Sequence, residues 1–170
     1  MSEQNIILTG FMATGKSSLG RLLAERLNYD FIDTDTEIER RRGCTVAAIF
    51  QNEGEAAFRA LETELVRELS QRHRLVIATG GGLVMNPVNV ELLQASGTII
   101  CLNAEPEEIL ARVSRQKHVR PLLQAPDPRA KIAELLAQRA PVYAQFRQLA
   151  TSGQTHAELI ARLLDIVNPA

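Results

Sequence analysis

The chain of 170 residues contains only two cysteines, no long apolar segment and almost no net charge. Because Cys44 and Cys101 form neither a CxxC pair nor a disulfide framework, we expect two reduced thiols in a cytoplasmic protein. Apolar runs such as Leu75–Ala78 and Ile99–Leu102 are far too short to span a bilayer. The first four residues lack the basic residues that begin a signal peptide. A formal net charge of −1 argues against a general nucleic-acid-binding domain, which is usually clearly basic. We therefore expect neither a membrane nor a nucleic acid as a partner.

Lysine is also scarce, with three lysines against sixteen arginines. The base composition of the genome would account for most of this bias. Arginine nevertheless supplies a planar fork of donors that fits carboxylate and phosphate groups, so some of the arginines can serve a binding site. Their positions in the chain must decide which ones.

The chain has no repeat, no low-complexity tract and no Gly/Ser linker, and its length suits one domain over residues 1–170. Short apolar runs alternate with segments of helical periodicity, which predicts an α/β fold with a parallel sheet covered on both faces. In such a fold, ligands bind beyond the carboxyl ends of the strands. Strands are expected at Asn5–Thr9, Phe31–Asp33, Leu75–Thr79, Thr98–Leu102 and Leu149–Thr151. Helices are expected at Leu19–Leu27, from Thr34 or Asp35 as N-cap to Arg42, and at Ala56–Leu69, Val88–Ala95, Pro106–Arg115, Arg129–Leu149 and His156–Val167.

One segment breaks this alternation. Residues Gln116–Pro128 hold three prolines and show little periodicity. A segment of this kind is long for a connection within a compact domain, and such loops are often lids. In the helix that follows, Pro141 should bend or interrupt the backbone.

The segment Gly10–Ser17 fits the pattern GxxxxGK[ST] between a predicted strand and a predicted helix, which is the context that a phosphate-binding loop requires. Glycines let such a loop approach an anion closely, and backbone N–H groups at the helix N-terminus point at the phosphate. Lys16 would place its charge on the β- and γ-phosphates, and Ser17 would ligate Mg²⁺. The alternative is a glycine-rich turn with an exposed lysine.

Two acidic residues and three glycines end the next strands of the expected sheet. Asp33 and Asp35 would point to the same side of an extended chain, where one can hold magnesium through water and the other can accept hydrogen bonds from a substrate. The alternative is ordinary helix N-capping by Asp35. Gly80–Gly82 directly follow the third strand and permit a ligand to approach the backbone, although a plain tight turn would use them equally well. Arg59 and Glu62 lie on one helical face, as an exposed ion pair would.

An ordered set of segments makes the chain similar to the shikimate kinase family along almost its whole length. These segments are GFMATGKSS (10–18), FIDTDTEIE (31–39), FRALE (58–62), GGG (80–82), VRPLL (119–123) and RAPVYAQ (139–145). The resemblance implies a three-layer P-loop kinase fold with a five-stranded parallel sheet, a mobile lid at about 113–127 and a substrate-binding helical region at about 34–62. It also implies transfer of the γ-phosphate of ATP to the 3-hydroxyl of shikimate, with one Mg²⁺ ion as cofactor. We expect a monomer.

The resemblance also assigns roles on the ATP side of the site. It places six residues around the phosphates, namely Ala13, Thr14, Gly15, Lys16, Ser17 and Ser18. Ser17 would ligate Mg²⁺ and Asp33 would hold the ion through water. Arg120, in the lid, resembles the arginine that closes over the transferring phosphate. Arg112 is the nearest match to an adenine-stacking arginine. Gln154 matches a late adenine contact, with Thr155 and His156 as alternatives.

On the substrate side, Asp35 resembles the residue that accepts a hydrogen bond from a shikimate hydroxyl and aligns or deprotonates the nucleophile. Arg59 and Arg139 match two arginines that hold the shikimate carboxylate, with Glu62 orienting them. Gly80, Gly81 and Gly82 would contact the substrate through their backbone. Lys16, Asp35 and Arg120 are thus the expected catalytic residues.

Two other classes of function remain open from the sequence. One is another small-molecule kinase of this fold, acting on gluconate or on a nucleotide. The other is a non-catalytic, nucleotide-dependent regulatory relative. The chain has no [NT]KxD segment of the kind that reads guanine in GTPases.

Overall fold

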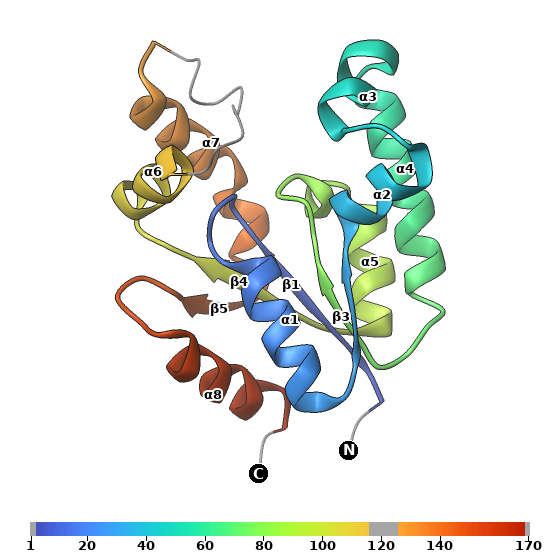
Figure 1. Cartoon of the computed structure of the whole chain (residues 1–170), viewed down its shortest axis with the longest axis vertical. Coiled ribbons are helices and arrows are strands. Elements are labelled where there is room, and N and C mark those ends of the chain that lie inside the picture. The colour runs from blue at the N-terminus through green and yellow to red at the C-terminus, as the bar shows by residue number, and fades with distance from the viewer. Residues whose placement is uncertain (1–2, 116–125, 169–170) are drawn as a thin grey trace.

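The computed structural model describes residues 3–115 and 126–168, and five strands within these ranges form one parallel sheet (Figure 1). The strands are β1 (Asn5–Gly10), β2 (Asp30–Asp33), β3 (Leu75–Ala78), β4 (Gly97–Asn103) and β5 (Arg147–Ala150), in the order β2-β3-β1-β4-β5. Every residue of β1 is buried, as expected for the central strand of a sheet that is covered on both faces. The predicted α/β class is confirmed.

Helices cover both faces of this sheet. They are α1 (Lys16–Leu27), α2 (Thr34–Arg42), α3 (Val46–Glu53), α4 (Glu55–Leu69), α5 (Pro87–Ser96), α6 (Pro106–Arg115), α7 (Pro128–Tyr143) and α8 (His156–Val167), with a short 3₁₀ helix at Leu83–Met85. Within the two described ranges, none of the helices is long and apolar enough to cross a membrane.

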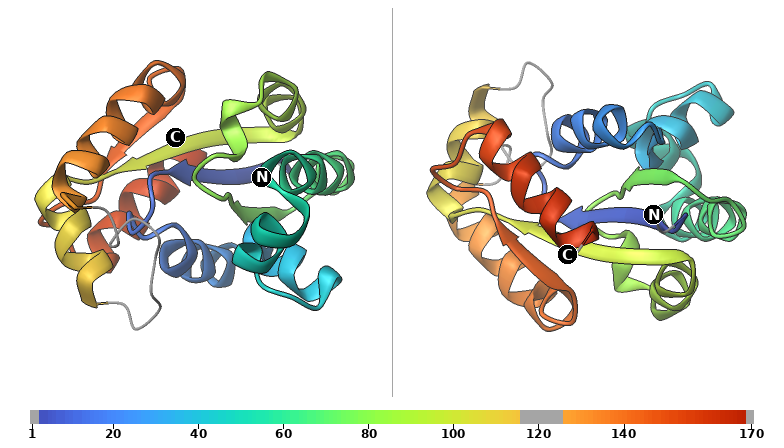
Figure 2. Two further views of the ribbon diagram at one scale, coloured as in Figure 1. Left: turned by 90° about the horizontal axis from the view of Figure 1, so that it is seen from above. Right: turned by 90° about the horizontal axis from the view of Figure 1, so that it is seen from below.

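The core lies in two layers, one on each face of the sheet. Since side chains of a strand alternate between the faces, Ile6 and Leu8 of β1 pack with α1 and α8, whereas Ile7 packs with α4, α5 and α7. Figure 2 shows this arrangement with the sheet between its helical layers. The carboxyl ends of β1, β2 and β3 therefore meet at one edge that the core leaves uncovered, and this edge carries the phosphate loop.

Three sequence expectations need correction. The helix α3 was missed, although Thr45 caps it by accepting from the Ala48 N–H at 3.1 Å and Gly54 ends it. The helix expected to run from Arg129 to Leu149 instead ends at Tyr143, two residues after Pro141, and the chain turns into β5. Proline lacks the N–H that would bond to the carbonyl four residues earlier, so Pro141 interrupts the hydrogen-bond ladder in the last turn of the helix.

The third correction concerns the start of α2. The N-cap is neither Thr34 nor Asp35 but Asp33, whose carboxylate accepts from the Thr36 N–H at 3.2 Å. Asp35 lies in the first turn of the helix, so the extended geometry expected for the two acids was wrong. Because Asp33 satisfies the helix end, the Asp35 carboxylate is not used as a cap.

The expected lid falls mostly between the two described ranges. Residues 113–115 belong to α6, and Asp127 caps α7 by accepting from the Ala130 N–H at 3.0 Å. Residues 116–125, including Arg120, lie outside the described residues.

Asn5, at the amino end of the central strand, binds the backbone of the segment that leads into β3 and provides a test of the fold. Its side chain is fully buried, donates to the Arg72 carbonyl at 2.8 Å and accepts from the Leu75 N–H at 3.0 Å. Asn5→Ala leaves both backbone groups without this partner, so the free energy of unfolding should fall by about 2–4 kcal/mol in urea denaturation. The control Asn52→Ala, at an exposed position of α3, should change it by less than about 0.5 kcal/mol. Equal effects of the two substitutions would contradict the assignment.

Candidate active site

The loop between β1 and α1 has the backbone that an anion-binding loop needs. Gly15 adopts φ 96°, and Ala13 adopts φ 59°, a left-handed conformation that is uncommon for a residue with a Cβ. A Cβ at Gly10 would lie 2.1 Å from the Leu102 carbonyl oxygen, so only glycine fits there. The Nζ atom of Lys16 turns back over the loop and donates to the carbonyls of Gly10 at 2.9 Å and Phe11 at 2.7 Å.

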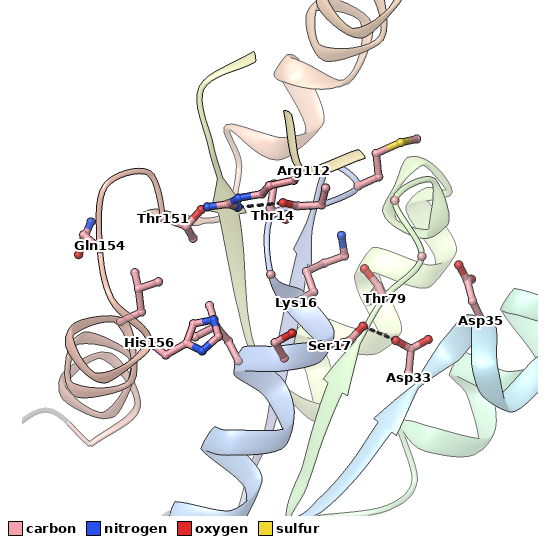
Figure 3. Close-up of a pocket in the computed structure, with 18 residues that line it drawn as sticks. Thr14, Lys16, Ser17, Asp33, Asp35, Thr79, Arg112, Thr151, Gln154 and His156 are labelled. Atoms are coloured by element: carbon pink, nitrogen blue, oxygen red, sulfur yellow. Dashed lines mark hydrogen bonds between the residues drawn. The ribbon is translucent and has the colours of Figure 1, made fainter. Parts of the chain in front are cut away.

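A cavity of about 560 Å³ opens above this loop (Figure 3). Its lining unites most of the residues that the sequence singled out, from five different elements or the loops next to them. These residues are Ala13, Thr14, Gly15, Lys16, Ser17, Ser18, Asp33, Asp35, Gly80, Gly81, Arg112 and Gln154. The alternative of a plain glycine-rich turn therefore has little support, because such a turn needs no cavity with converging polar groups.

Ser17 and Asp33 meet beside Lys16 at the floor of the cavity. The Ser17 hydroxyl donates to the Asp33 carboxylate at 2.5 Å, the dashed contact in Figure 3. A hydroxyl and a carboxylate are hard oxygen ligands of the kind that Mg²⁺ prefers, so the donor set fits this ion. In the described part of the chain, no cluster of three His, Cys, Asp or Glu side chains is placed to hold a metal. A magnesium ion held largely by nucleotide phosphates and water needs no such cluster.

Asp35 faces the same cavity from α2 and has an unusual electrostatic environment. Burial raises the pKa of its carboxyl from 3.8 to about 6, with Asp33 adding to the rise and Lys16 opposing it. Its Oδ1 atom is buried and has no hydrogen-bond partner in the structure. A buried acceptor of this kind, aimed at a cavity, is suited to a ligand donor.

The three glycines after β3 each lie against a different residue of the predicted substrate site. A Cβ at Gly80 would lie 2.5 Å from the Asp35 Oδ1 atom. A Cβ at Gly81 would lie 2.9 Å from Nη1 of Arg139, and one at Gly82 would lie 2.7 Å from Nη2 of Arg59. The glycine segment therefore has no space for side chains, because one carboxylate and two guanidinium groups occupy it. Arg59, Gly82 and Arg139 are not among the residues lining the 560 Å³ cavity. Arg139 lies against Gly81, which does line it, and Arg59 lies against Gly82, the next residue in the chain.

Arg59 is held between two glutamates and two rings. Its Nη1 atom donates to Glu62 at 2.8 Å and its Nη2 atom to Glu55 at 3.1 Å. Its guanidinium carbon lies 5.4 Å from the ring centre of Phe58 and 5.9 Å from that of Phe50.

Glu62 is not the exposed partner that the spacing suggested, since it is only 1% exposed. Burial raises the pKa of this carboxyl to about 7, against the opposing effect of Arg59.

Arg112 and the 154–156 segment flank the other side of the cavity. Arg112 donates to the Ala13 carbonyl at 2.9 Å and pairs with Glu108, so it is tied to the phosphate loop. Gln154 and His156 both line the cavity. Thr155 is instead the N-cap of α8, where it forms a capping box with Glu158.

Several residues of the site escaped the sequence analysis. Thr34 accepts from the Gly80 N–H at 2.9 Å, Thr151 lines the cavity, and Phe50 comes from the missed helix α3. Tyr143 donates to the Gly81 carbonyl at 2.7 Å. The sequence could have indicated Tyr143, because it follows Arg139 by four residues and so lies on the same helical face.

A phosphate loop on the central strand of a parallel sheet, with a lysine, a hydroxyl–carboxylate pair and a buried acid at one cavity, defines a P-loop kinase fold. The family model described as "Shikimate kinase" matches residues 12–168. The chain belongs to the shikimate kinase family.

Individual relatives agree with this family. A shikimate kinase of Pelotomaculum thermopropionicum is 52% identical over 140 residues, covering 82% of this chain and 81% of the relative. One of Ralstonia nicotianae is 42% identical over 167 residues, covering 98% and 86%. The structure of a shikimate kinase from Acinetobacter baumannii in complex with shikimate superimposes with a TM-score of 0.90 at 39% identity, covering 98% of this chain and 93% of that one.

The raised pKa of Glu62 predicts how stability depends on pH. In the unfolded chain this carboxyl has a pKa of 4.5, and in the folded protein about 7, so the folded state holds the extra proton between these values. Its contribution to stability is therefore complete below pH 4.5 and is lost as the pH rises through 7, by on the order of 3 kcal/mol. Urea denaturation of the ligand-free protein at several pH values should show this decline.

Glu62→Gln should remove most of the decline, whereas Glu64→Gln, at an exposed position of the same helix, should keep it. Asp35 contributes in the same direction between pH 3.8 and about 6, so a smaller slope should remain in Glu62→Gln. An unchanged slope in Glu62→Gln would show that Glu62 is already ionised in the folded protein.

Proposed function

We propose that this protein is an ATP-dependent kinase that transfers the γ-phosphate of ATP to the 3-hydroxyl of shikimate, giving shikimate 3-phosphate and ADP. The single observation that supports it most is the convergence of Asp35, Arg139 and Arg59 on three consecutive glycines next to a phosphate loop. This arrangement suits an acceptor that carries both hydroxyl groups and a carboxylate. The relatives and the shikimate complex named above support the same assignment.

On the nucleotide side, residues 13–18 bind the phosphates through loop N–H groups, and Lys16 exchanges its loop carbonyls for the β- and γ-phosphates. Arg112 and Gln154 contact the adenine side of the nucleotide, at the end of the cavity away from Asp35. His156 remains an alternative to Gln154, because both line the cavity.

One Mg²⁺ ion would be held by Ser17 directly and by Asp33 through water, since the Ser17 hydroxyl and the Asp33 carboxylate already lie together. The bound ion would neutralise charge on the β- and γ-phosphates. Asp33 keeps its geometry because its other oxygen is fixed as the cap of α2.

On the acceptor side, Arg59 and Arg139 bind the carboxylate, and Gly80–Gly82 contribute backbone contacts. Asp35 accepts a hydrogen bond from a substrate hydroxyl and aligns it in line with the γ-phosphate. A carboxyl whose pKa is about 6 is mostly ionised at neutral pH and is also basic enough to take a proton from the nucleophile.

Arg120, in a lid at about 113–127, supplies positive charge to the transferring phosphate when the lid excludes water. The chain works as one kinase domain over residues 1–170, with acceptor binding in the helical region 34–62, as a cytoplasmic monomer.

A kinase for gluconate or a nucleotide remains the alternative of the same class. Gluconate also carries a carboxylate, and a nucleoside monophosphate carries a phosphate, so the two arginines beside Gly81 and Gly82 do not separate these acceptors from shikimate. The match of the chain to the shikimate kinase family favours shikimate. A non-catalytic relative is disfavoured because Lys16, Ser17, Asp33 and Asp35 all face one cavity.

A coupled assay that detects ADP tests the function. With ATP and Mg²⁺, shikimate should be phosphorylated at least about 100-fold more efficiently, as kcat/KM, than gluconate or nucleoside monophosphates. The reason is that transfer needs an acceptor whose hydroxyl reaches Asp35, in line with the γ-phosphate, while its acidic group lies on Arg59 and Arg139. Phosphorylation of gluconate in preference to shikimate would overturn the proposal.

Lys16→Met should lower kcat by at least about 10²-fold while the thermal unfolding temperature stays the same. A Lys16→Met variant within tenfold of wild type would remove Lys16 from the mechanism.

Arg139→Ala should weaken the binding of shikimate far more than that of ATP. Loss of one charged partner of the carboxylate costs about 2–4 kcal/mol, or roughly 30- to 1,000-fold in affinity. Calorimetry with each ligand measures both effects. Arg129→Ala is the matched control, because Arg129 lies on the same helix but pairs with Glu107 at the surface. Equal losses for ATP and shikimate in Arg139→Ala would argue against a dedicated carboxylate site.

A further inference from the structure

Tyr143 makes a hydrogen bond that a residue with only a packing role would not need. Its ring belongs to the core beside the sheet and is 7% exposed, so phenylalanine would fill the same space. Its hydroxyl nevertheless reaches the glycine segment and donates to the Gly81 carbonyl at 2.7 Å. A buried phenol requires such a partner, and the partner chosen here is the backbone of the substrate site.

The same hydroxyl also contacts Arg139. The two residues lie one turn apart on α7, and both approach the position where a Cβ of Gly81 would stand, with Nη1 of Arg139 at 2.9 Å and the Tyr143 hydroxyl oxygen at 3.9 Å. Burial raises the pKa of the Tyr143 phenol, while the charge of Arg139 and its hydrogen bond to the phenol oppose that rise. The phenol thus donates its proton to the Gly81 carbonyl, with the guanidinium of Arg139 close to its oxygen.

These contacts restrain two parts that would otherwise move. A long arginine side chain loses rotamer entropy when it is held in one geometry for binding. A glycine peptide is the most flexible kind of backbone, and here the Gly81 peptide must stay beside the guanidinium of Arg139. The face of Arg139 is further limited by the Phe11 ring, whose centre lies 5.4 Å from the guanidinium carbon. One phenol therefore fixes both the arginine and the glycine relative to each other.

We propose that Tyr143 is a positioning residue for the carboxylate site, one that holds Arg139 and the Gly81 peptide in their binding geometry without touching the substrate. This inference rests on the proposed function, since it assigns Arg139 to the acceptor carboxylate. It adds a residue whose effect passes through Arg139 and Gly81 alone. ATP binding, which uses the phosphate loop, should not depend on it.

Tyr143→Phe tests the inference because it keeps the ring and removes the hydroxyl. The Kd and KM for shikimate should rise about tenfold, which is the loss expected for one hydrogen bond. The kcat at saturating shikimate should fall less than about threefold, and the Kd for ATP should stay unchanged. Tyr29→Phe is the matched control, because Tyr29 is the other tyrosine of the chain and packs against α8 and β1, away from the cavity lining. It should leave all these values unchanged.

A double-mutant cycle separates positioning from simple core packing. If Tyr143 acts in part through Arg139, adding Tyr143→Phe to Arg139→Ala should weaken shikimate binding by clearly less than the roughly tenfold expected in wild type, because only the effect through the Gly81 peptide remains. A full tenfold further loss in that background would overturn the inference, as would an unchanged shikimate KM in the single variant. Equal weakening of ATP and shikimate with a lower unfolding temperature would also overturn it, because that is the result of a merely structural role.

A spectroscopic measurement tests the inference without the Tyr143→Phe variant. The chain has no tryptophan, so in the Tyr29→Phe protein all intrinsic fluorescence excited at tyrosine wavelengths comes from Tyr143. Shikimate should change the intensity of this fluorescence with a midpoint equal to its Kd from calorimetry. The reason is that its carboxylate binds the Arg139 guanidinium, which lies beside the phenol. A signal that stays constant at saturation would overturn the inference. If wild type has no activity on shikimate at all, the proposed function fails instead, which is a separate outcome.

Discussion

The site depends on three consecutive positions without a Cβ at the carboxyl end of β3. Gly80, Gly81 and Gly82 leave room for a carboxylate and two guanidinium groups that come from α2, α7 and α4. Any side chain there would displace one of these groups, since each would meet it at less than 3 Å. Helices α2, α4 and α7 must therefore place these charged side chains at this strand end. Helices α2 and α4 bring one pair of charges, and α7 brings the third, to a strand end that the topology already places beside the phosphate loop.

Charge balance explains why this crowded edge is stable. Arg59 lies against Glu62 and Glu55, and Asp35 lies within the influence of Lys16 and Arg59. Three buried acceptors among the described residues nevertheless have no partner, and two of them, Oδ1 of Asp35 and Oε1 of Glu62, belong to this edge, whereas the third is Oδ1 of Asn89. Unsatisfied buried groups cost free energy and are rare in native proteins, so two of them near Arg59 suit a site arranged for a ligand. Part of the stability of the ligand-free protein is therefore given up for pre-organisation, and the raised pKa values of both carboxyl groups reflect it.

Much of this architecture could be predicted from the sequence because the relevant signals are local. Strand ends, glycines and the phosphate loop are all read within a few residues, and the order of the motifs gave the family. Other features depend on packing between distant segments. The burial of Glu62 depends on the packing of α4 against α2, α3 and α5. Asp33, the N-cap of α2, also accepts from Ser17, sixteen residues away. The helix α3 was missed because its eight residues show too little periodicity, although it supplies the Phe50 ring beside Arg59.

Lysine and arginine have different roles at this site. The single lysine of the phosphate loop serves a phosphate group as a point charge, and its Nζ atom can change partners from loop carbonyls to phosphate oxygens with only a rotation of the side chain. The arginines that flank the glycines act differently. Each guanidinium is planar, packs its face on an aromatic ring and keeps its edge for hydrogen bonds, as Arg59 does with Phe58 and Arg139 with Phe11. An ammonium group cannot combine these contacts. The two kinds of cation therefore suit different parts of the site. The Lys16 ammonium is a mobile point charge for the phosphates, whereas the planar guanidinium groups of Arg59 and Arg139 can orient a planar carboxylate.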